Sequence, residues 1–182
     1  MYYRKYVGER IYFSPINKED YQLYTKWLND EKISRGTNQV HKIITEDFEK
    51  EWISHAYEKG RYQFAVVNKS NDEPIGIYGL ELKNDMSKQY FFVGFIGEDD
   101  YRGIGVGTEA LKLLTNFAFD ILNAHTLYTT IYSYNISSLK SVVKAGYKKC
   151  GILREAIYYG NCYYDEYIFE MTRDEYFKLY DK

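Results

Sequence analysis

A glycine-rich stretch, Tyr101 to Thr108, has the residue types and the spacing to bind an anion. Its glycines, Gly103, Gly105 and Gly107, leave backbone N–H groups accessible to a ligand. An apolar run, Tyr90 to Ile96, precedes this loop, and a helical pattern of apolar residues begins directly after it. A helix start adds its own unpaired N–H groups and the positive end of its dipole. The order strand, glycine loop, helix therefore predicts a site for a phosphate or pyrophosphate.

Two common phosphate-binding patterns do not account for this stretch. A P-loop ends in Gly-Lys-Ser/Thr, whereas Gly107 is followed by Thr108 and Glu109, so no lysine reaches the phosphates. The segment Gly105 to Ala110 satisfies the Rossmann pattern, but that fold needs an acidic residue at the end of the next strand. The next expected strand, Thr126 to Tyr132, carries no acid at its end. For the loop taken alone, a tight glycine connection without a ligand remains the alternative.

The pattern Arg102-x-x-Gly105-x-Gly107 resembles motif A of the GNAT superfamily of N-acetyltransferases, which reads Gln/Arg-x-x-Gly-x-Gly/Ala between a strand and a helix. In that family the backbone of the loop holds the pyrophosphate of acetyl-coenzyme A. Further segments resemble the RimJ/RimL branch, in the same order along the chain: Gly8 to Ile16, Trp27 to Asp30, Asn135 to Ser138, Lys144 to Tyr147, and Gly151 to Ala156 with Gly160 and Asp165. The resemblance thus covers almost the whole chain.

The resemblance implies which residues hold acetyl-CoA. The pyrophosphate would bind the N–H groups of the loop, and the pantetheine arm would lie along the end of the preceding strand, as a neighbouring strand would. One N–H of that strand end would stabilise the oxyanion. Asn135 would lie at the slot for the arm, or cap the next helix, or do both. The residues expected to bind the donor are Phe95, Ile96, Gly97, Arg102, Gly103, Ile104, Gly105, Val106, Gly107, Thr108, Asn135, Ser138 and Lys144.

The proton donor for the leaving thiolate departs from the pattern of many family members. These carry a tyrosine two positions before the lysine of the Lys-x-Gly segment, and this chain has Val142 there. The resemblance to the RimJ/RimL branch implies Ser138 instead, whose alternative role is a polar residue in the first turn of a helix. A tyrosine of the segment Tyr158 to Tyr164, or a water molecule, could also supply the proton.

The general base is equally open. Family members often carry a glutamate near the strand that precedes the glycine loop, and the aligned positions in this chain are Phe91 and Phe92. The resemblance leaves Glu155, in the final hairpin, and Glu81, on the preceding strand, as candidates. Each could also be an ordinary surface carboxylate, and a chain of water molecules could take the proton from an exposed amine.

The acceptor is expected to be a primary amine. A protein N-terminal amine is what the RimJ/RimL likeness implies, and a small amine such as a polyamine, an amino sugar or an antibiotic is the alternative. A non-catalytic acyl-CoA-binding module would explain the missing tyrosine and glutamate. A nucleotide-binding oxidoreductase would require that NAD, rather than coenzyme A, stabilises the fold.

Composition sets the remaining expectations. The chain has 182 residues, enough for one domain spanning 1–182, and a net charge of −2, which favours neither nucleic acid nor an anionic membrane. Cys150 and Cys162 lack metal-ligand spacing, so we expect free thiols, no metal and a cytoplasmic protein. No run of apolar residues approaches the length of a membrane span.

A monomer or a homodimer is expected. Tyrosine is unusually frequent, with 22 copies, most of which should simply replace other apolar residues.

The elements that position these residues can be predicted from periodicity. Seven strands are expected at Arg10–Ile16, Gln63–Val67, Pro74–Leu82, Tyr90–Ile96, Thr126–Tyr132, Tyr147–Leu153 and Cys162–Thr172. Four helices should follow Asn17, Thr45, Gly105 and Asn135, the second with Phe48, Trp52 and Ala56 on one face. Because a helix crosses between the fourth and fifth strands, these two should be parallel. The sequence therefore predicts a mixed α/β (α+β), GNAT-like fold: a mostly antiparallel seven-stranded sheet with a central parallel pair, flanked by about four helices.

Overall fold

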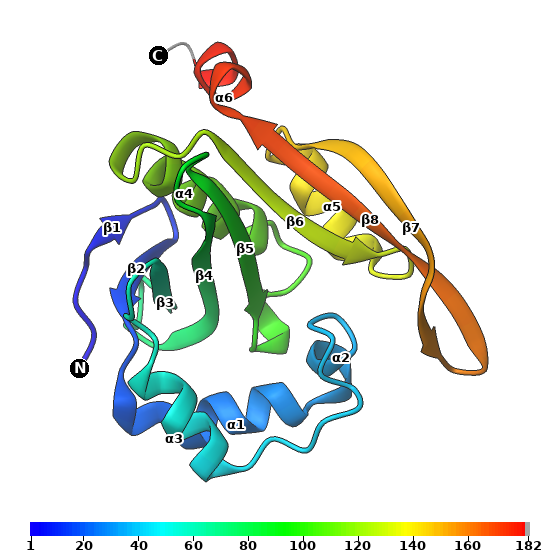
Figure 1. Ribbon diagram of the computed structural model, residues 1–182. Coiled ribbons are helices and arrows are strands. Elements are labelled where there is room, and N and C mark those ends of the chain that lie inside the picture. Colours follow the sequence, from blue (N-terminus) through cyan, green and yellow to red (C-terminus); the bar gives the residue numbers. More distant parts are fainter. Residues whose placement is uncertain (181–182) are drawn as a thin grey trace.

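Eight strands form one sheet in the computed structural model, which describes residues 1–180 (Figure 1). The strands are β1 (Tyr6–Val7), β2 (Ile11–Pro15), β3 (Arg61–Asn68), β4 (Pro74–Asn84), β5 (Gln89–Ile96), β6 (Thr126–Tyr132), β7 (Lys148–Tyr159) and β8 (Cys162–Thr172). Their order is β1-β2-β3-β4-β5-β6-β8-β7, and every neighbouring pair is antiparallel except β5 and β6. The predicted mixed sheet with a central parallel pair is confirmed.

The predicted number of strands, seven, is wrong by one. The additional strand is β1, in which Tyr6 and Val7 pair with Phe13 and Tyr12 of β2. Two residues are too few to give an alternating pattern, so sequence periodicity could not reveal this edge strand.

The four expected helices are present, together with two that were not expected. The helices are α1 (Tyr21–Asn29), α2 (Glu31–Ser34), α3 (Glu46–Ser54), α4 (Val106–Asn116), α5 (Ile136–Lys144) and α6 (Arg173–Tyr180). Short turns η1 (Lys18–Asp20), η2 (Asp99–Tyr101) and η3 (Phe117–Ile121, a π-helical turn) flank α1, the glycine loop and α4. The unexpected α2 is one turn long and is capped by Asp30, whose Oδ1 accepts from the N–H of Lys32 at 2.8 Å. No helix within residues 1–180 is long and apolar enough to cross a membrane.

The two faces of the sheet carry separate cores. Helices α1, α2 and α3 contribute Tyr24, Trp27, Ile33 and Ile53 to the core on one face, which we call the α1–α3 face. On the other, the α4–α5 face, α4 and α5 pack on the larger core. Side chains alternate along a regular stretch of strand, so neighbouring residues there serve opposite faces of the sheet. On β5, for example, Phe92 and Ile96 face α4 and α5, and Phe95 faces α1.

The parallel strands β5 and β6 pair only at their beginnings and then diverge (Figure 1). The ladder joins Gln89, Tyr90 and Phe91 to Thr126, Leu127 and Tyr128, and does not continue to the strand ends. One side-chain bridge follows, in which the hydroxyl of Thr129 donates to the carbonyl of Phe92 at 2.9 Å. Beyond it the sheet has a gap between the ends of β5 and β6, beside the glycine loop.

Candidate functional site

The glycine loop adopts the backbone conformation that its glycines allow. Gly103 has φ +74° and Gly105 has φ +91°, a region that residues with a Cβ rarely occupy. Gly105 is the N-cap of α4, and no side chain caps that helix start. The first N–H groups of α4 therefore have no side-chain acceptor from the protein, as a site for an anion requires.

Glu109, in the first turn of α4, would repel an anion in the loop, but its carboxylate is held elsewhere. It accepts from the backbone N–H and the Nε of Arg10, each at 2.9 Å. Burial raises the pKa of Glu109, but the bonds from Arg10 and Ile11 outweigh burial and leave the pKa below its ordinary value. Another nitrogen of Arg10 donates to the carbonyl of Ile104 at 2.7 Å. Arg10 thus anchors the loop to the start of β2 and partly neutralises the glutamate.

The side chain of Arg102, the first residue of the predicted motif, binds backbone carbonyl groups of the protein. Its guanidinium donates to the carbonyls of Ile96 at 2.9 Å and Gly97 at 2.7 Å, and forms an ion pair with Asp99 at 2.6 Å. The side chain therefore fixes the end of β5 relative to the loop. It also lines the cleft described next.

A cleft of about 500 Å³ runs from the glycine loop to the gap, and we call it the donor cleft. The predicted residues of the strand and loop that line it are Phe95, Ile96, Gly103, Gly105, Gly107 and Thr108. Asn135, Ser138 and the exposed Lys144 line it from the opposite side.

Three predicted residues do not line this cleft. Gly97 packs on Trp27, where a Cβ would lie 2.3 Å from the indole ring. Ile104 is 57% exposed, and Val106 is buried in the core on the α4–α5 face. Tyr78 and Ser141 line the cleft without having been predicted.

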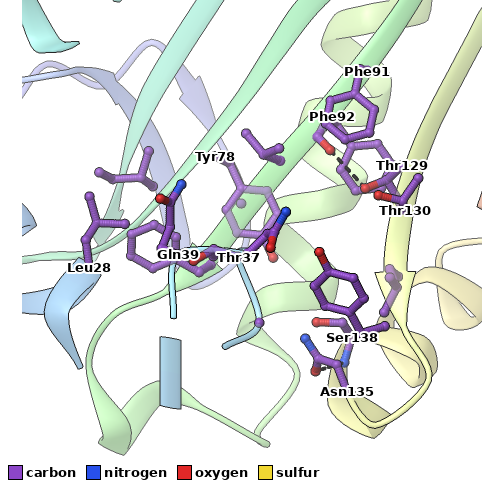
Figure 2. Close-up of a pocket in the computed structure, with 18 of the residues that line it drawn as sticks. Leu28, Thr37, Gln39, Tyr78, Phe91, Phe92, Thr129, Thr130, Asn135 and Ser138 are labelled. Atoms are coloured by element: carbon purple, nitrogen blue, oxygen red, sulfur yellow. Dashed lines mark hydrogen bonds between the residues drawn. The ribbon is translucent and has the colours of Figure 1, made fainter. Parts of the chain in front are cut away.

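A second cavity, of about 520 Å³, passes through the gap and reaches the α1–α3 face (Figure 2). Its lining includes Phe92 and Val142 from the α4–α5 side, and Gln63 and Trp52 from the other. In Figure 2, Leu28 and Gln39 lie on one side of the view, and Asn135 and Ser138 on the other, with Tyr78 between them. We call the part that lies on the α1–α3 face the acceptor pocket.

The residues shared by both cavities mark where they meet. These are Gly36, Thr37, Tyr78, Gly94, Phe95, Asn135, Ser138 and Ser141. The ring of Tyr78 lies against Gly94, where a Cβ would be 2.4 Å from a ring carbon, and its hydroxyl donates to the carbonyl of Gly107 at 3.1 Å. The absence of a side chain at Gly94 therefore makes room for the ring of Tyr78.

Asn135 and Ser138 lie where the two cavities meet. The Oδ1 of Asn135 accepts from the N–H of Ser138 at 3.2 Å, which is the predicted helix cap. The side-chain nitrogen of Asn135 lies close to Gly36, where a Cβ would be 3.0 Å away. Ser138 and Ser141 are one turn apart on α5 and both line the meeting point. Val142 is buried.

The two carboxylates considered as bases lie outside both cavities. Glu81 forms an ion pair with Lys83 at 2.6 Å, and its side chain is 43% exposed. Glu155 is exposed at an irregularity of the β7–β8 ladder, with φ +50°, and its N–H donates to Asp165 at 3.0 Å. Tyr164 packs on Tyr134, with ring centroids 4.9 Å apart, and does not line either cavity.

The carboxylates that do line the acceptor pocket are Glu49 and Glu166, and neither was predicted. Glu49, on α3, is 1% exposed, and neither of its oxygens has a hydrogen-bond partner among residues 1–180. Burial raises its pKa from 4.5 to about 7. Phe48, expected on the buried face of this helix, is 48% exposed. The helix turns Glu49 and Ile53 inward instead.

The uncapped start of α4 thus borders a cleft that meets a second cavity in the gap of the sheet. The chain belongs to the GNAT family of acetyltransferases, because the family's acetyltransferase (GNAT) domain matches residues 10–148. It is 29% identical over 173 residues to the SPbeta prophage-derived N-acetyltransferase YokL of Bacillus subtilis (strain 168), and the match covers 94% of each chain. The chain is therefore an N-acetyltransferase.

Solved structures share its fold. The spermidine N-acetyltransferase of Vibrio cholerae, in complex with CoA and spermine, superposes with a TM-score of 0.82 at 18% identity, over 93% of this chain and 99% of that one. The ribosomal-protein-S5-alanine acetyltransferase of Vibrio fischeri superposes with a TM-score of 0.76 at 16% identity, over 93% and 96%. At these identities the likeness shows the fold alone.

Proposed function

We propose that the protein transfers an acetyl group from acetyl-CoA directly to a small primary amine, in the gap between β5 and β6. The observation that carries this proposal is the meeting of the donor cleft and the acceptor pocket in that gap, from opposite faces of the sheet. A donor and an acceptor that enter from opposite faces of the sheet can be bound at the same time and come into contact in the gap.

Acetyl-CoA would bind through backbone groups. Its pyrophosphate would accept from the N–H groups of the loop from Gly103 to Thr108 and the start of α4. Gly97 donates its N–H to the carbonyl of Ile75 on β4 at 2.7 Å. Because the direction of backbone groups alternates along a strand, the N–H groups of Ile96 and Gly94 should point to the gap. They would pair with the pantetheine arm and stabilise the oxyanion of the tetrahedral intermediate.

The transfer itself needs no covalent enzyme intermediate. The amine nitrogen attacks the thioester carbonyl carbon, the carbon–sulfur bond breaks, and the thiolate of coenzyme A takes up a proton. The hydroxyl of Ser138, at the meeting point, would supply that proton and regain one from water. The attacking nitrogen would lose its proton to water, and Glu81 and Glu155 could assist only through water, since they lie outside both cavities.

Two observations bear on the acceptor. The volume of the cavity, about 520 Å³, is in the range that holds small ligands, and side chains of α1 and α3 bound it on the α1–α3 face. A protein N-terminal amine is the second candidate, because the sequence resembles the RimJ/RimL branch and a ribosomal-protein acetyltransferase shares the fold. The volume of this cavity favours small amines.

The test is the release of free thiol from acetyl-CoA with a panel of small primary amines and, separately, peptides with free N-termini. Turnover of small amines with formation of the acetylated amine is expected. Turnover of the peptides alone would favour the second candidate. If acetyl-CoA binds and no amine in either panel is acetylated, the proposed function is wrong.

A further inference from the structure

Three side chains that line the acceptor pocket have buried oxygen atoms without a hydrogen-bond partner within residues 1–180. These are both carboxylate oxygens of Glu49, the Oε1 of Gln63 and the Oε1 of Gln39. Glu49 and Gln63 are 1% and 4% exposed. A buried polar atom without a partner costs roughly 1–3 kcal/mol, and more if it is charged. Three such groups along one cavity point to a ligand that donates hydrogen bonds.

Protonation of Glu49 does not remove this cost. Burial raises its pKa to about 7, so the neutral acid is substantially populated in the empty protein at neutral pH. A neutral carboxyl group still leaves a donor and an acceptor without partners. Lys42 and Glu166 are the other charged side chains of the cavity, and neither is bonded to Glu49. No side chain within residues 1–180 donates to Glu49 in the structure, so a cationic ligand is a suitable partner for it.

The position of Glu49 distinguishes it from the reacting centre. Glu49 and Gln63 line the acceptor pocket and not the donor cleft. Ile53, one turn further along α3, packs over strands β2 to β4. The Oε1 of Gln63 lies above Gly79 of β4, where a Cβ would be 2.0 Å away. Since neighbouring strands are about 4.8 Å apart, the Oε1 of Gln63 lies roughly one or two strand spacings, about 5–10 Å, from the gap beyond β5.

We propose that Glu49 is a specificity-determining residue that binds a second ammonium group of the acceptor, so that the preferred substrate is a diamine. This inference rests on the proposed acetyl transfer in the gap and names its substrate class. One amine of the substrate reacts in the gap while the other, roughly four to six methylene groups away given that spacing, pairs with Glu49 and donates to Gln63. The aromatic rings of Trp52 and Phe48 line the same pocket and suit a cationic chain.

The first experiment measures binding without turnover. The protein saturated with coenzyme A is titrated calorimetrically with diaminobutane, diaminopentane and diaminohexane, and with butylamine, pentylamine and hexylamine as matched monoamines. At least one diamine should bind about 10-fold or more tightly than its monoamine. In Glu49→Gln this preference should disappear, and in Glu51→Gln it should remain, because Glu51 is an exposed carboxylate on the same helix.

A shortened carboxylate provides a second variant. Glu49→Asp keeps the carboxylate but shortens the side chain by one methylene group. The diamine that binds most tightly should therefore be a longer one than for the wild-type protein. Equal affinities of the wild-type protein for diamines and monoamines would overturn the proposal. It would equally be overturned if the diamine preference survived unchanged in Glu49→Gln.

Turnover separates this inference from the proposed function. If monoamines and diamines are acetylated equally well, the proposed acetyl transfer is supported and the proposed role of Glu49 is wrong. If diamines bind through Glu49 and none is acetylated, the proposed binding role of Glu49 is supported and the proposed function is wrong. If acetyl transfer and the role of Glu49 are both correct, Glu49→Gln should raise KM for diamines about 10-fold or more. The same variant should leave kcat/KM for monoamines nearly unchanged.

Discussion

Replacing Glu49 by glutamine should stabilise the empty protein at neutral and alkaline pH. The pKa of Glu49 is about 7 in the folded state and 4.5 in the unfolded chain, so folding favours the protonated form. The contribution of Glu49 to stability is therefore fully present below pH 4.5 and is lost as the pH rises to about 7. At about 1.4 kcal/mol per pKa unit, this loss approaches roughly 3 to 4 kcal/mol and then levels off. Glutamine has no charge to bury, so Glu49→Gln escapes this loss.

Urea unfolding of both proteins between pH 4 and pH 9 measures the difference. The two unfolding free energies should agree near pH 4 and separate to about 3 kcal/mol by pH 8, with the variant the more stable. Glu51→Gln, on the exposed side of α3, should follow the wild-type curve. Saturating diamine at pH 8 should reduce this difference in unfolding free energy, because it stabilises only the wild-type protein. A difference that does not depend on pH would refute the account of Glu49 as a buried, unpaired carboxyl group.

Three further predictions concern the donor cleft and the chemistry. Gly105→Val should weaken acetyl-CoA binding by at least about 10-fold, or 1.4 kcal/mol, in calorimetric titration, whereas Gly160→Val, also at positive φ but in the distant hairpin turn, should leave affinity unchanged. Circular dichroism checks that both variants fold. The double variant Cys150→Ala, Cys162→Ala should retain most turnover, because both thiols are exposed and neither lines a cavity; a trapped acetyl-cysteine in a mass spectrum would contradict direct transfer. Ser138→Ala should lower kcat by roughly 10²-fold with acetyl-CoA affinity nearly unchanged, and an unchanged kcat would make Ser138 structural only.

The donor half could be predicted from the sequence because it is local. The strand, the glycine loop and the helix start follow one another within about twenty residues, from Gln89 to Val106, and each has its own pattern. The parallel direction of β5 and β6 could also be predicted, because a crossover helix joins them. The contacts of Arg102 with the end of β5 could not, since a guanidinium can bind phosphate or backbone carbonyls equally well.

The acceptor half could not be predicted, because its carboxylate lies on a face that the pattern assigned to solvent. Phe48, Trp52 and Ala56 recur at helical spacing, which suggests that they form the buried face of α3. The structure rotates the helix by about one residue, so that Glu49 and Ile53 are buried and Phe48 is 48% exposed. Tertiary packing decides such a rotation, and a glutamate between apolar residues carries no sign that it will be buried.

The cost of burying Glu49 is itself an argument about its role. A glutamine at this position would have a similar shape and would spare the folded protein the loss of stability between pH 4.5 and about pH 7. Nothing in the donor half depends on Glu49, because it lines only the acceptor pocket. A carboxylate that weakens the fold and does not contact the donor is best explained by what it binds. The ammonium group of an acceptor lowers its pKa again, so the loss of stability in the empty protein is recovered when that acceptor is bound.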